Sequence, residues 1–338
     1  MIQTDAIIVG AGPVGLFAVF ELGLLGLRTH VIDVLDKPGG QCAEFYPEKP
    51  IYDIPGLPAC TGQELTDNLM RQIRPFEPVF HFGTCAQRLE ELPGSRWRLT
   101  TDDGLVFEAP AIVVAAGGGS FTPKKPPIPG IERFEGHGVD YAVRRIEALR
   151  GQRVVISGGG DSALDWTIAL RDVASRVTLV HRRTEFRAAP DSVRRMMALA
   201  EQGQIDFLLG EVNSVQADGS ELCGIGVRTE GGLVDLPCDR FLPFFGLTMK
   251  MGPVGEFGLA LQGGRIVVDT EKFESSRRGV FAIGDINHYP GKLKLILSGF
   301  HEAALMAQQA FRYARPEERL LFQYTTTSTR LKEKLETT

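Results

Sequence analysis

A strand, a glycine turn, a helix and a second strand follow one another at the start of this chain and form one local unit. Residues 6–9 form a short apolar run typical of a buried strand, and residues 10–15 (GAGPVG) form the turn. An apolar pattern with helical spacing covers 16–26, and a second apolar strand covers 29–32 and ends at Asp33. This order predicts a βαβ unit whose two strands are parallel.

The same unit occurs again 148 residues further along the chain. A strand at 153–157 precedes the turn GGGDSA at 158–163, and a helix over 164–173 precedes a strand over 176–180. An internal repeat of this kind indicates two copies of one fold. The sequence therefore predicts an α/β protein with two Rossmann-like dinucleotide-binding domains, each a parallel sheet flanked by helices.

The composition is that of a globular protein large enough for two domains. The chain has 338 residues, of which 43% are apolar and 23% charged, and its net charge of −5 argues against a nucleic-acid-coating protein. No stretch has the length and apolar content of a membrane span, and the first residues do not have the basic start of a secretory signal. Five cysteines without close pairs indicate a reducing cytoplasm, and neither cysteines nor histidines have metal-ligand spacing, so no metal is expected.

The first glycine turn has the spacing of a dinucleotide-binding fingerprint. Gly10 permits the tight turn, Gly12 allows a pyrophosphate to approach the backbone, and Gly15 allows the helix to pack closely on the strand. The helix N-terminus favours a diphosphate, and Asp33, 23 residues after Gly10, is suited to accept hydrogen bonds from a ribose diol. This combination favours FAD. The alternative is a purely structural turn followed by a solvated aspartate.

The second turn differs where the ribose would lie. Its fingerprint residues are Gly158, Gly160 and Ala163, but the residue 23 positions after Gly158 is a histidine. Three arginines follow, which are Arg182, Arg183 and Arg187. An acid would repel a 2′-phosphate, whereas guanidinium groups bind it through forked hydrogen bonds, so this site favours NADPH over NADH. The alternative is a solvated basic face.

Two segments rich in proline and glycine divide the chain. They lie at 121–130 and 243–255, and proline there cannot continue a helix or a central strand. We interpret them as links between domains. The expected FAD-binding domain is discontinuous and comprises 1–118 and 247–338, and the expected NADPH-binding domain comprises 119–246.

The C-terminal third adds a second acid to the first site. A strand beginning at 279 ends on Asp285, which we expect to hold the ribityl and phosphate region of a flavin. A long, mostly apolar helix is expected over 293–312, and its N-terminus is suited to stabilising a reduced flavin anion.

The order of these motifs resembles that of the thioredoxin-reductase-like flavoproteins. GAGPVG, the glycines and glutamine at 39–41, GGGDSA, HRRTEFRA and FAIGD follow one another along nearly the whole chain as in that family. Thioredoxin reductases carry a CxxC disulfide shortly before the second glycine turn, whereas residues 138–145 contain no cysteine here. Dithiol exchange needs a thiolate beside its resolving partner, so this chain lacks the usual means for that chemistry.

A narrower group is more similar. The segments QCAEFYPEK at 41–49 and IYDIPG at 51–56, with GGGDSALDW and the YTTT at 324–327, resemble the ferredoxin–NADP reductases of the thioredoxin-reductase-like type. The resemblance implies that Tyr46 and Tyr324 stack on the flavin ring, and ordinary half-buried packing is the alternative for both. It also implies FAD contacts at a further set of positions, which are Asp33, Gln41, Ala86, Phe121, Asp285 and Thr326.

The resemblance implies a ferredoxin–NADP⁺ reductase that uses FAD to move electrons between NADPH and ferredoxin or flavodoxin, and it implies a homodimer. No catalytic protein side chain is expected, because the hydride passes between cofactors. Two alternatives stay open: an NADPH-dependent reductase of a disulfide carrier or a low-molecular-weight thiol, and a flavin-binding sensor or scaffold. A basic stretch comprises Lys124, Lys125, Arg144, Arg145 and Arg150. It is suited to binding an acidic partner protein, and a solvated charged face explains it equally well.

Overall fold

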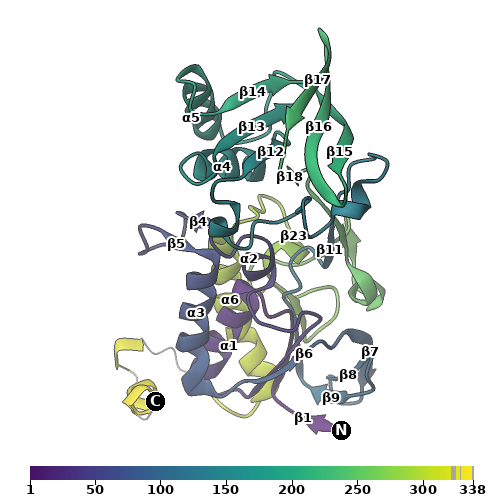
Figure 1. The fold of residues 1–338 in the computed structure, drawn as a ribbon. Coiled ribbons are helices and arrows are strands. Elements are labelled where there is room, and N and C mark those ends of the chain that lie inside the picture. The colour runs from purple at the N-terminus through teal and green to yellow at the C-terminus, as the bar shows by residue number, and fades with distance from the viewer. Residues whose placement is uncertain (321–324, 328, 337–338) are drawn as a thin grey trace. The chain divides into compact units, whose positions relative to one another are not determined.

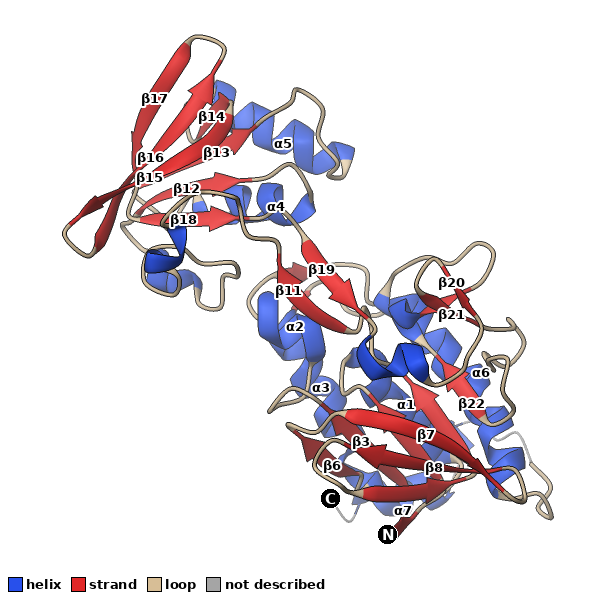
Figure 2. Ribbon diagram, turned by 90° about the vertical axis from the view of Figure 1, so that its right-hand side faces the viewer, coloured by secondary structure: helices blue, strands red, loops and turns tan. Residues whose placement is uncertain are grey.

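The chain divides into two compact units. The computed structural model describes residues 1–320, 325–327 and 329–336. The first unit comprises Met1–Ser120 and Met249–Thr338, and the second comprises Phe121–Thr248. Each boundary falls inside a short strand, β11 (Ser120–Pro123) or β19 (Leu247–Lys250), and these two strands pair with each other (Figure 2). Figure 1 shows the course of the whole chain. The division lies within two residues of the one expected from the proline- and glycine-rich links.

The first unit is built on a five-stranded parallel sheet with the order β22-β10-β2-β3-β6. Its strands are β2 (Ala6–Val9), β3 (Thr29–Asp33), β6 (Val79–Phe82), β10 (Ala111–Val114) and β22 (Val280–Ala282). Every residue of β2, β10 and β22 is buried, which is characteristic of a parallel sheet that is covered on both faces.

Helices cover one face of this sheet and an antiparallel meander covers the other (Figure 2). The helices are α1 (Pro13–Leu24), α3 (Gly62–Ile73) and α6 (Ile296–Ala314). The meander consists of β7 (Ala86–Leu92), β8 (Arg96–Thr101) and β9 (Val106–Ala109), and β1 (Ile2–Gln3) pairs in parallel with β9, which gives the sheet order β1-β9-β8-β7. Its buried side chains Trp97, Leu99 and Phe107 join the same core. The sequence analysis did not predict the meander, although apolar and polar residues alternate along β8.

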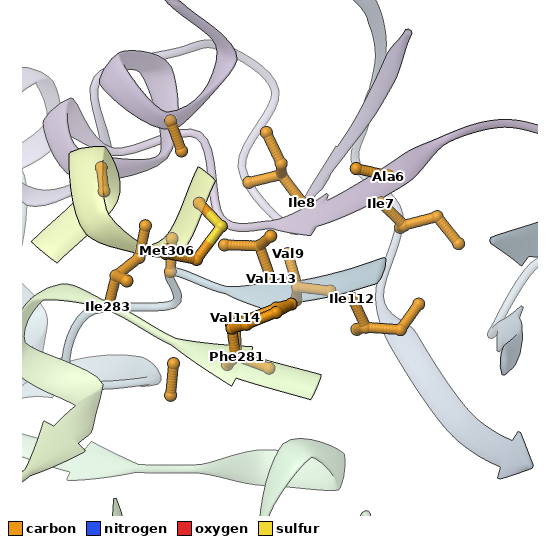
Figure 3. Close-up of a cluster of buried hydrophobic side chains, with 14 of the residues drawn as sticks. Ala6, Ile7, Ile8, Val9, Ile112, Val113, Val114, Phe281, Ile283 and Met306 are labelled. Carbon is orange, nitrogen blue, oxygen red and sulfur yellow. The ribbon is translucent and has the colours of Figure 1, made fainter. Parts of the chain in front are cut away.

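The core of the first unit lies between α6 and the central strands (Figure 3). Ile8 of β2, Val113 of β10 and Phe281 of β22 are wholly buried, as is Met306 of α6. Strands that lie 100 residues or more apart in the sequence therefore meet in one hydrophobic cluster. This cluster fixes the carboxyl ends of β2 and β22, where Gly10 and Asp285 follow.

The predicted long helix begins later than expected. Helix α6 starts at Ile296, three residues after the predicted 293, because Leu295 is in an extended conformation. Shorter elements complete the first unit, and they are α2 (Gly40–Phe45), β4 (Pro50–Ile51), β5 (Cys60–Thr61), η1 (Arg74–Phe76), η4 (Gly252–Glu256), β20 (Leu261–Gln262), β21 (Arg265–Val267), η5 (Gly284–Ile286), β23 (Asn287–His288), η6 (Thr325–Thr327) and α7 (Thr329–Glu336). No helix in the described ranges combines the length and apolar content needed to cross a membrane.

The second unit repeats the parallel βαβ arrangement. Its parallel sheet has the order β14-β13-β12-β18, formed by β12 (Arg153–Ser157), β13 (Arg176–His181), β14 (Asp206–Leu209) and β18 (Arg240–Pro243). An antiparallel sheet adds β15 (Glu211–Asp218), β16 (Glu221–Thr229) and β17 (Gly232–Pro237), and the helical elements are α4 (Asp161–Leu170), α5 (Pro190–Glu201), η2 (Ile131–Phe134) and η3 (Ile146–Leu149). The prediction of two Rossmann-like units is confirmed.

Candidate functional site

The first glycine turn is closed by protein at its two outer glycines and open at its middle one. Gly10 has φ +113°, and a Cβ there would overlap the carbonyl oxygen of Ala115. A Cβ on Gly15 would overlap the carbonyl oxygen of Gly10. At Gly12, in contrast, no atom lies within 4 Å of that point. Packing therefore requires glycine at both ends of the turn, while the space beside Gly12 is available to a ligand.

Asp33 supports this turn from the end of β3. Its Oδ2 accepts a hydrogen bond from the backbone N–H of Ala11 at 2.6 Å, and its Oδ1 accepts one from Leu35 at 2.8 Å. Burial raises the pKa of Asp33, and these two backbone donors oppose the rise. A carboxylate has about four acceptor positions, so two remain for the hydroxyl groups of a ligand. Helix α1 begins beside it with neither a side-chain cap nor an acidic first turn, which leaves backbone donors for an anion.

Two further segments close around Asp33 and Gly12. The N–H of Gly39 donates to the carbonyl oxygen of Ala11 at 2.9 Å, and a Cβ on Gly40 would lie 3.0 Å from Cα of Gly12. This contact brings Gln41, the second residue of α2, to the turn. The second segment follows β6. Its Thr84 donates its N–H to the carbonyl oxygen of Asp33 at 3.0 Å, and the buried Ala86 lies two residues further along the chain.

Asp285, Tyr46 and Cys42 form a group of interacting side chains in the same unit. Burial, aided by the Asp285 carboxylate, raises the pKa of Cys42 to about 11 and moves that of Tyr46 far above its usual range. The thiol of Cys42 donates to Oη of Tyr46 at 3.5 Å. Asp285 follows Gly284, whose Cβ position lies 3.5 Å from Val14 in the first turn of α1. The segment that carries Asp285 therefore lies beside the start of α1. Cys42 is no thiolate nucleophile at neutral pH.

Two further expected FAD contacts lie in other segments of the chain. Phe121 is partly buried and is the first residue of the second unit. Thr326 is exposed in η6 and makes no hydrogen bond within the described residues. The following helix α7 packs on η1, where Nζ of Lys334 donates to the carbonyl oxygen of Pro75 at 3.1 Å. Tyr324 lies outside the described residues.

The second glycine turn has the same pattern of closed and open positions. A Cβ on Gly158 would lie 2.6 Å from the carbonyl oxygen of Phe244 and 2.9 Å from Cβ of Ala163, which is wholly buried. At Gly160 no atom lies within 4 Å. The middle glycine of each turn thus faces open space, and the two outer positions are set by packing.

The ribose end of the second turn is organised by His181. Its ring lies against Gly159, its Nε2 is 3.1 Å from the carbonyl oxygen of Glu185, and it contacts the Phe186 ring with centroids 4.8 Å apart. The N–H of Arg187 donates to the carbonyl oxygen of Gly159 at 2.7 Å. The sequence analysis treated His181 only as the residue that replaces an acid and missed its structural role.

The three expected phosphate-binding arginines, Arg182, Arg183 and Arg187, are all exposed. None of their guanidinium groups forms an ion pair with the part of the chain that the structure describes. The basic stretch is different, because Lys125 pairs with Glu135 at 2.7 Å and Arg150 pairs with Glu147 at 2.6 Å. Its positive charge is therefore partly neutralised.

The described residues contain no cluster of three or more side chains able to hold a metal ion. Both glycine turns offer groups that can bind a ligand. Each has an open middle glycine and a helix start without a side-chain cap, with carboxylate acceptors in the first unit and exposed guanidinium groups in the second.

Comparisons with known proteins agree with this geometry. The family model described as pyridine nucleotide-disulphide oxidoreductase matches residues 4–310. A ferredoxin–NADP reductase of Parvibaculum lavamentivorans is 61% identical over 99% of this chain and 98% of its own, and one of Mesorhizobium japonicum is 60% identical with the same coverage.

Among solved structures, a thioredoxin reductase of Lactococcus lactis is similar with a TM-score of 0.76 and 23% identity over 93% of this chain and 99% of its own. A thioredoxin reductase of T. acidophilum has a TM-score of 0.77 and 22% identity over 92% of this chain and 98% of its own. At these identities the likeness concerns the fold.

Proposed function

Because the chain belongs to the ferredoxin–NADP reductase family within the pyridine nucleotide-disulphide oxidoreductases, we propose that it is an FAD-dependent enzyme that moves electrons between NADPH and ferredoxin. One observation carries the proposal. Each unit has a glycine turn open at its middle glycine, and the charges that follow the two turns are opposite, with Asp33 in the first unit and Arg182 and Arg183 in the second.

The first unit suits FAD. The space at Gly12 accommodates a pyrophosphate, the uncapped start of α1 offers N–H donors, and Asp33 has acceptor positions to spare. We assign FAD to the following residues: Gly10, Gly12, Gly15, Asp33, Gln41, Tyr46, Ala86, Phe121, Asp285 and Thr326. Among them, Phe121 and Thr326 are assigned from the family resemblance alone. The resemblance is also the only basis for Tyr324 as a residue that stacks on the flavin.

The second unit suits NADPH. The open position at Gly160 accommodates its pyrophosphate, and unpaired guanidinium groups suit its 2′-phosphate. We assign NADPH to Gly158, Gly160, Ala163, Arg182, Arg183 and Arg187.

The protein's own work in this reaction is binding and orientation. When bound, FAD would supply the conversion between a two-electron hydride and single electrons that a reaction between NADPH and an iron–sulfur carrier requires. The side chains must hold the nicotinamide and the flavin with their reacting atoms roughly 3–3.5 Å apart. No side chain has to act as an acid or a base, which agrees with the raised pKa values of Cys42 and Tyr46.

The test of the function begins with the purified protein. We expect a yellow protein with bound FAD whose visible absorbance is bleached by NADPH and restored by oxidised ferredoxin, with cytochrome c as the final acceptor. A protein that reduces a disulfide carrier or a thiol disulfide but not ferredoxin would favour the first alternative. A flavoprotein that NADPH does not bleach would favour the sensor or scaffold.

The C-terminal segment provides a separate test. We expect Tyr324 to cover the flavin ring and to move before the nicotinamide can reach it, and the two links between the units permit such domain motion. Deleting residues 320–338 should then increase the rate of flavin reduction by NADPH. An unchanged rate would contradict a covering role.

We also propose an electron acceptor, an oligomeric state and a cellular location for the protein. Flavodoxin is an alternative acidic acceptor, and the exposed Lys124, Arg144 and Arg145 suit such partners. The family resemblance favours a homodimer, and five free cysteines favour the cytoplasm. Light scattering tests the dimer, and a fall of ferredoxin kcat/KM with rising salt tests the charged surface.

A further inference from the structure

A fully buried carboxylate on α6 is bound entirely by the segment that follows β22. Glu302 has no solvent-exposed surface. Its Oε2 accepts hydrogen bonds from the N–H of Gly284 at 2.6 Å and from Nδ2 of Asn287 at 2.8 Å. Its Oε1 accepts from Oη of Tyr289 at 2.9 Å and from Nζ of Lys292. All of its acceptor positions are used, and every donor lies within residues 284–292.

Lys292 balances the charge of Glu302 inside the protein. Its side chain is only 6% exposed, and it forms an ion pair with Glu302. A buried ion pair gives little stability compared with an apolar pair of similar size, whereas removal of one partner leaves an expensive unpaired charge. The pair is therefore better explained by the conformation that it specifies than by the stability that it adds.

The conformation in question is that of η5, which carries Asp285. Gly284 is the first residue of η5, has φ +78° and donates directly to Glu302. Asn287, just after η5, donates both to Glu302 and to the carbonyl oxygen of Ala282 at 3.0 Å. The side chain of Asp285, which lies between these anchors, makes no hydrogen bond within the described residues. Its carboxylate is thus free to bind a ligand, while its backbone is fixed on both sides.

The first turn of α1 completes this arrangement. Cβ positions on Gly284 and on Gly299 of α6 would each contact Val14, the second residue of α1. Helix α6 therefore touches η5 through Glu302 and touches the start of α1 through Gly299. A change at Glu302 is transmitted to Asp285 by one backbone hydrogen bond, at a point next to the open glycine turn.

We propose that Glu302, neutralised by Lys292, is a positioning residue that holds η5 so that Asp285 faces the flavin. This inference rests on the proposed function, because it assumes that FAD lies at Asp285. Glu302 does not touch the flavin. It sets the direction of a group that does, and its loss is expected to alter both FAD affinity and the reduction potential of the bound flavin.

The test separates the hydrogen bond to Gly284 from the ion pair. The variant Lys292→Met/Glu302→Gln removes both charges but keeps an acceptor oxygen for Gly284, whereas Lys292→Met/Glu302→Ala removes that acceptor as well. We expect the alanine variant to bind FAD on the order of tenfold more weakly than the glutamine variant, by analogy with metal sites, where loss of the hydrogen-bond partner of a ligand costs at least about that much affinity. We also expect its midpoint potential, measured with dithionite, to differ.

A second buried carboxylate provides a matched control. Glu274 is buried, its Oε2 is 2.9 Å from Nζ of Lys272, and its Oε1 accepts from the N–H of Gly279 at 2.7 Å. This pair precedes β22, whereas Asp285 follows it. The variants Lys272→Met/Glu274→Gln and Lys272→Met/Glu274→Ala should differ in melting temperature but bind FAD equally and share one midpoint potential.

The outcomes are distinct. If the two variants at Glu302 share one FAD Kd and one midpoint potential, the positioning role is wrong. If the alanine variant does not fold, the variant Glu302→Asp replaces it in the test, because it shortens the side chain by one methylene and keeps the charge. An unchanged FAD Kd and midpoint potential in Glu302→Asp would also overturn the inference. Failure of the wild-type protein to bind FAD would instead contradict the proposed function.

Discussion

The two glycine turns use one backbone design with opposite chemistry at the ribose end. In both, the outer positions are packed against protein and the middle glycine faces open space. In the first, Asp33 accepts two backbone hydrogen bonds and is held firmly. In the second, the His181 ring packs against the turn at Gly159, and the charge is provided by exposed arginines. The comparison indicates that packing decides where glycine is required, and that a few residues after the next strand decide which nucleotide binds.

The largest effect is expected at the outer positions. Gly15→Ala places a Cβ on the carbonyl oxygen of Gly10, so α1 must shift and FAD should be lost together with much of the stability of the first unit. The reverse change in the second unit, Ala163→Gly, should cost only about 2 kcal/mol, because it increases helix flexibility and removes one buried methyl group. FAD content and thermal unfolding check both. A stable Gly15→Ala variant that retains FAD would contradict the packing argument.

The middle glycines allow a more selective test. Gly12 has φ −70° and Gly160 has φ −104°, which alanine tolerates, and neither Cβ would meet protein atoms. Gly12→Ala should therefore fold normally but weaken FAD binding by about tenfold or more, because the methyl group occupies the pyrophosphate position. Gly160→Ala should instead raise the KM for NADPH and leave FAD bound. If each variant affected both nucleotides equally, the assignment of one nucleotide to each turn would be wrong.

Arginine replacement examines the difference in charge. Arg182→Ala/Arg183→Ala should reduce kcat/KM for NADPH on the order of a hundredfold and change that for NADH little, because the lost guanidinium groups serve only the 2′-phosphate. The control is Arg171→Ala, a change at another exposed arginine of the second unit, which pairs with Asp172. Equal losses with both coenzymes would refute the phosphate role.

The smallest effect concerns acid sensitivity of the first unit. Nδ1 of His30 and Nε2 of His81 are 2.9 Å apart on neighbouring strands, and burial lowers the pKa of both. The unfolded chain, with histidine pKa values near about 6.5, takes up protons first as the pH falls, so the stability that the neutral pair provides is present above about pH 6.5 and declines below it.

The melting temperature measured from pH 8 to pH 5 checks this expectation. In the variant His30→Gln/His81→Gln, the fall in melting temperature over this pH range should be smaller by roughly a few degrees, which is a small shift for thermal unfolding. The second unit has no such histidine pair among its described residues, so its unfolding should respond less to acid. A double variant with the wild-type pH profile would exclude the pair as the cause.

Much of the candidate site was predictable because its parts are contiguous. The strand–turn–helix order, the glycine spacing and the charges of Asp33 and Arg182 are each contained in about 25 residues, where local sterics and hydrogen-bond geometry limit the conformations. The link segments were predictable for the same reason, since proline removes a backbone donor wherever it occurs.

Other features were not predictable from local pattern. The meander β7–β9 pairs short strands whose partners are set by burial of Trp97 and Phe107 on the parallel sheet. The start of α6 at Ile296 depends on the extended residue before it, in a segment that is held by Lys292. The hydrogen bond between Cys42 and Tyr46 depends on how α2 ends, which no motif specifies.

The glycine spacing and the residues after each second strand were enough to predict two dinucleotide folds in one chain with opposite charges at their ribose ends. The hydrogen bond from Gly284 to Glu302, and the effect of Asp285 on the pKa values of Tyr46 and Cys42, could be seen only in the folded protein. The two kinds of feature differ in how far apart in the sequence the interacting residues are. A turn and its charge are fixed by neighbouring residues, whereas a buried carboxylate finds its donors only after the helix and the sheet have packed together.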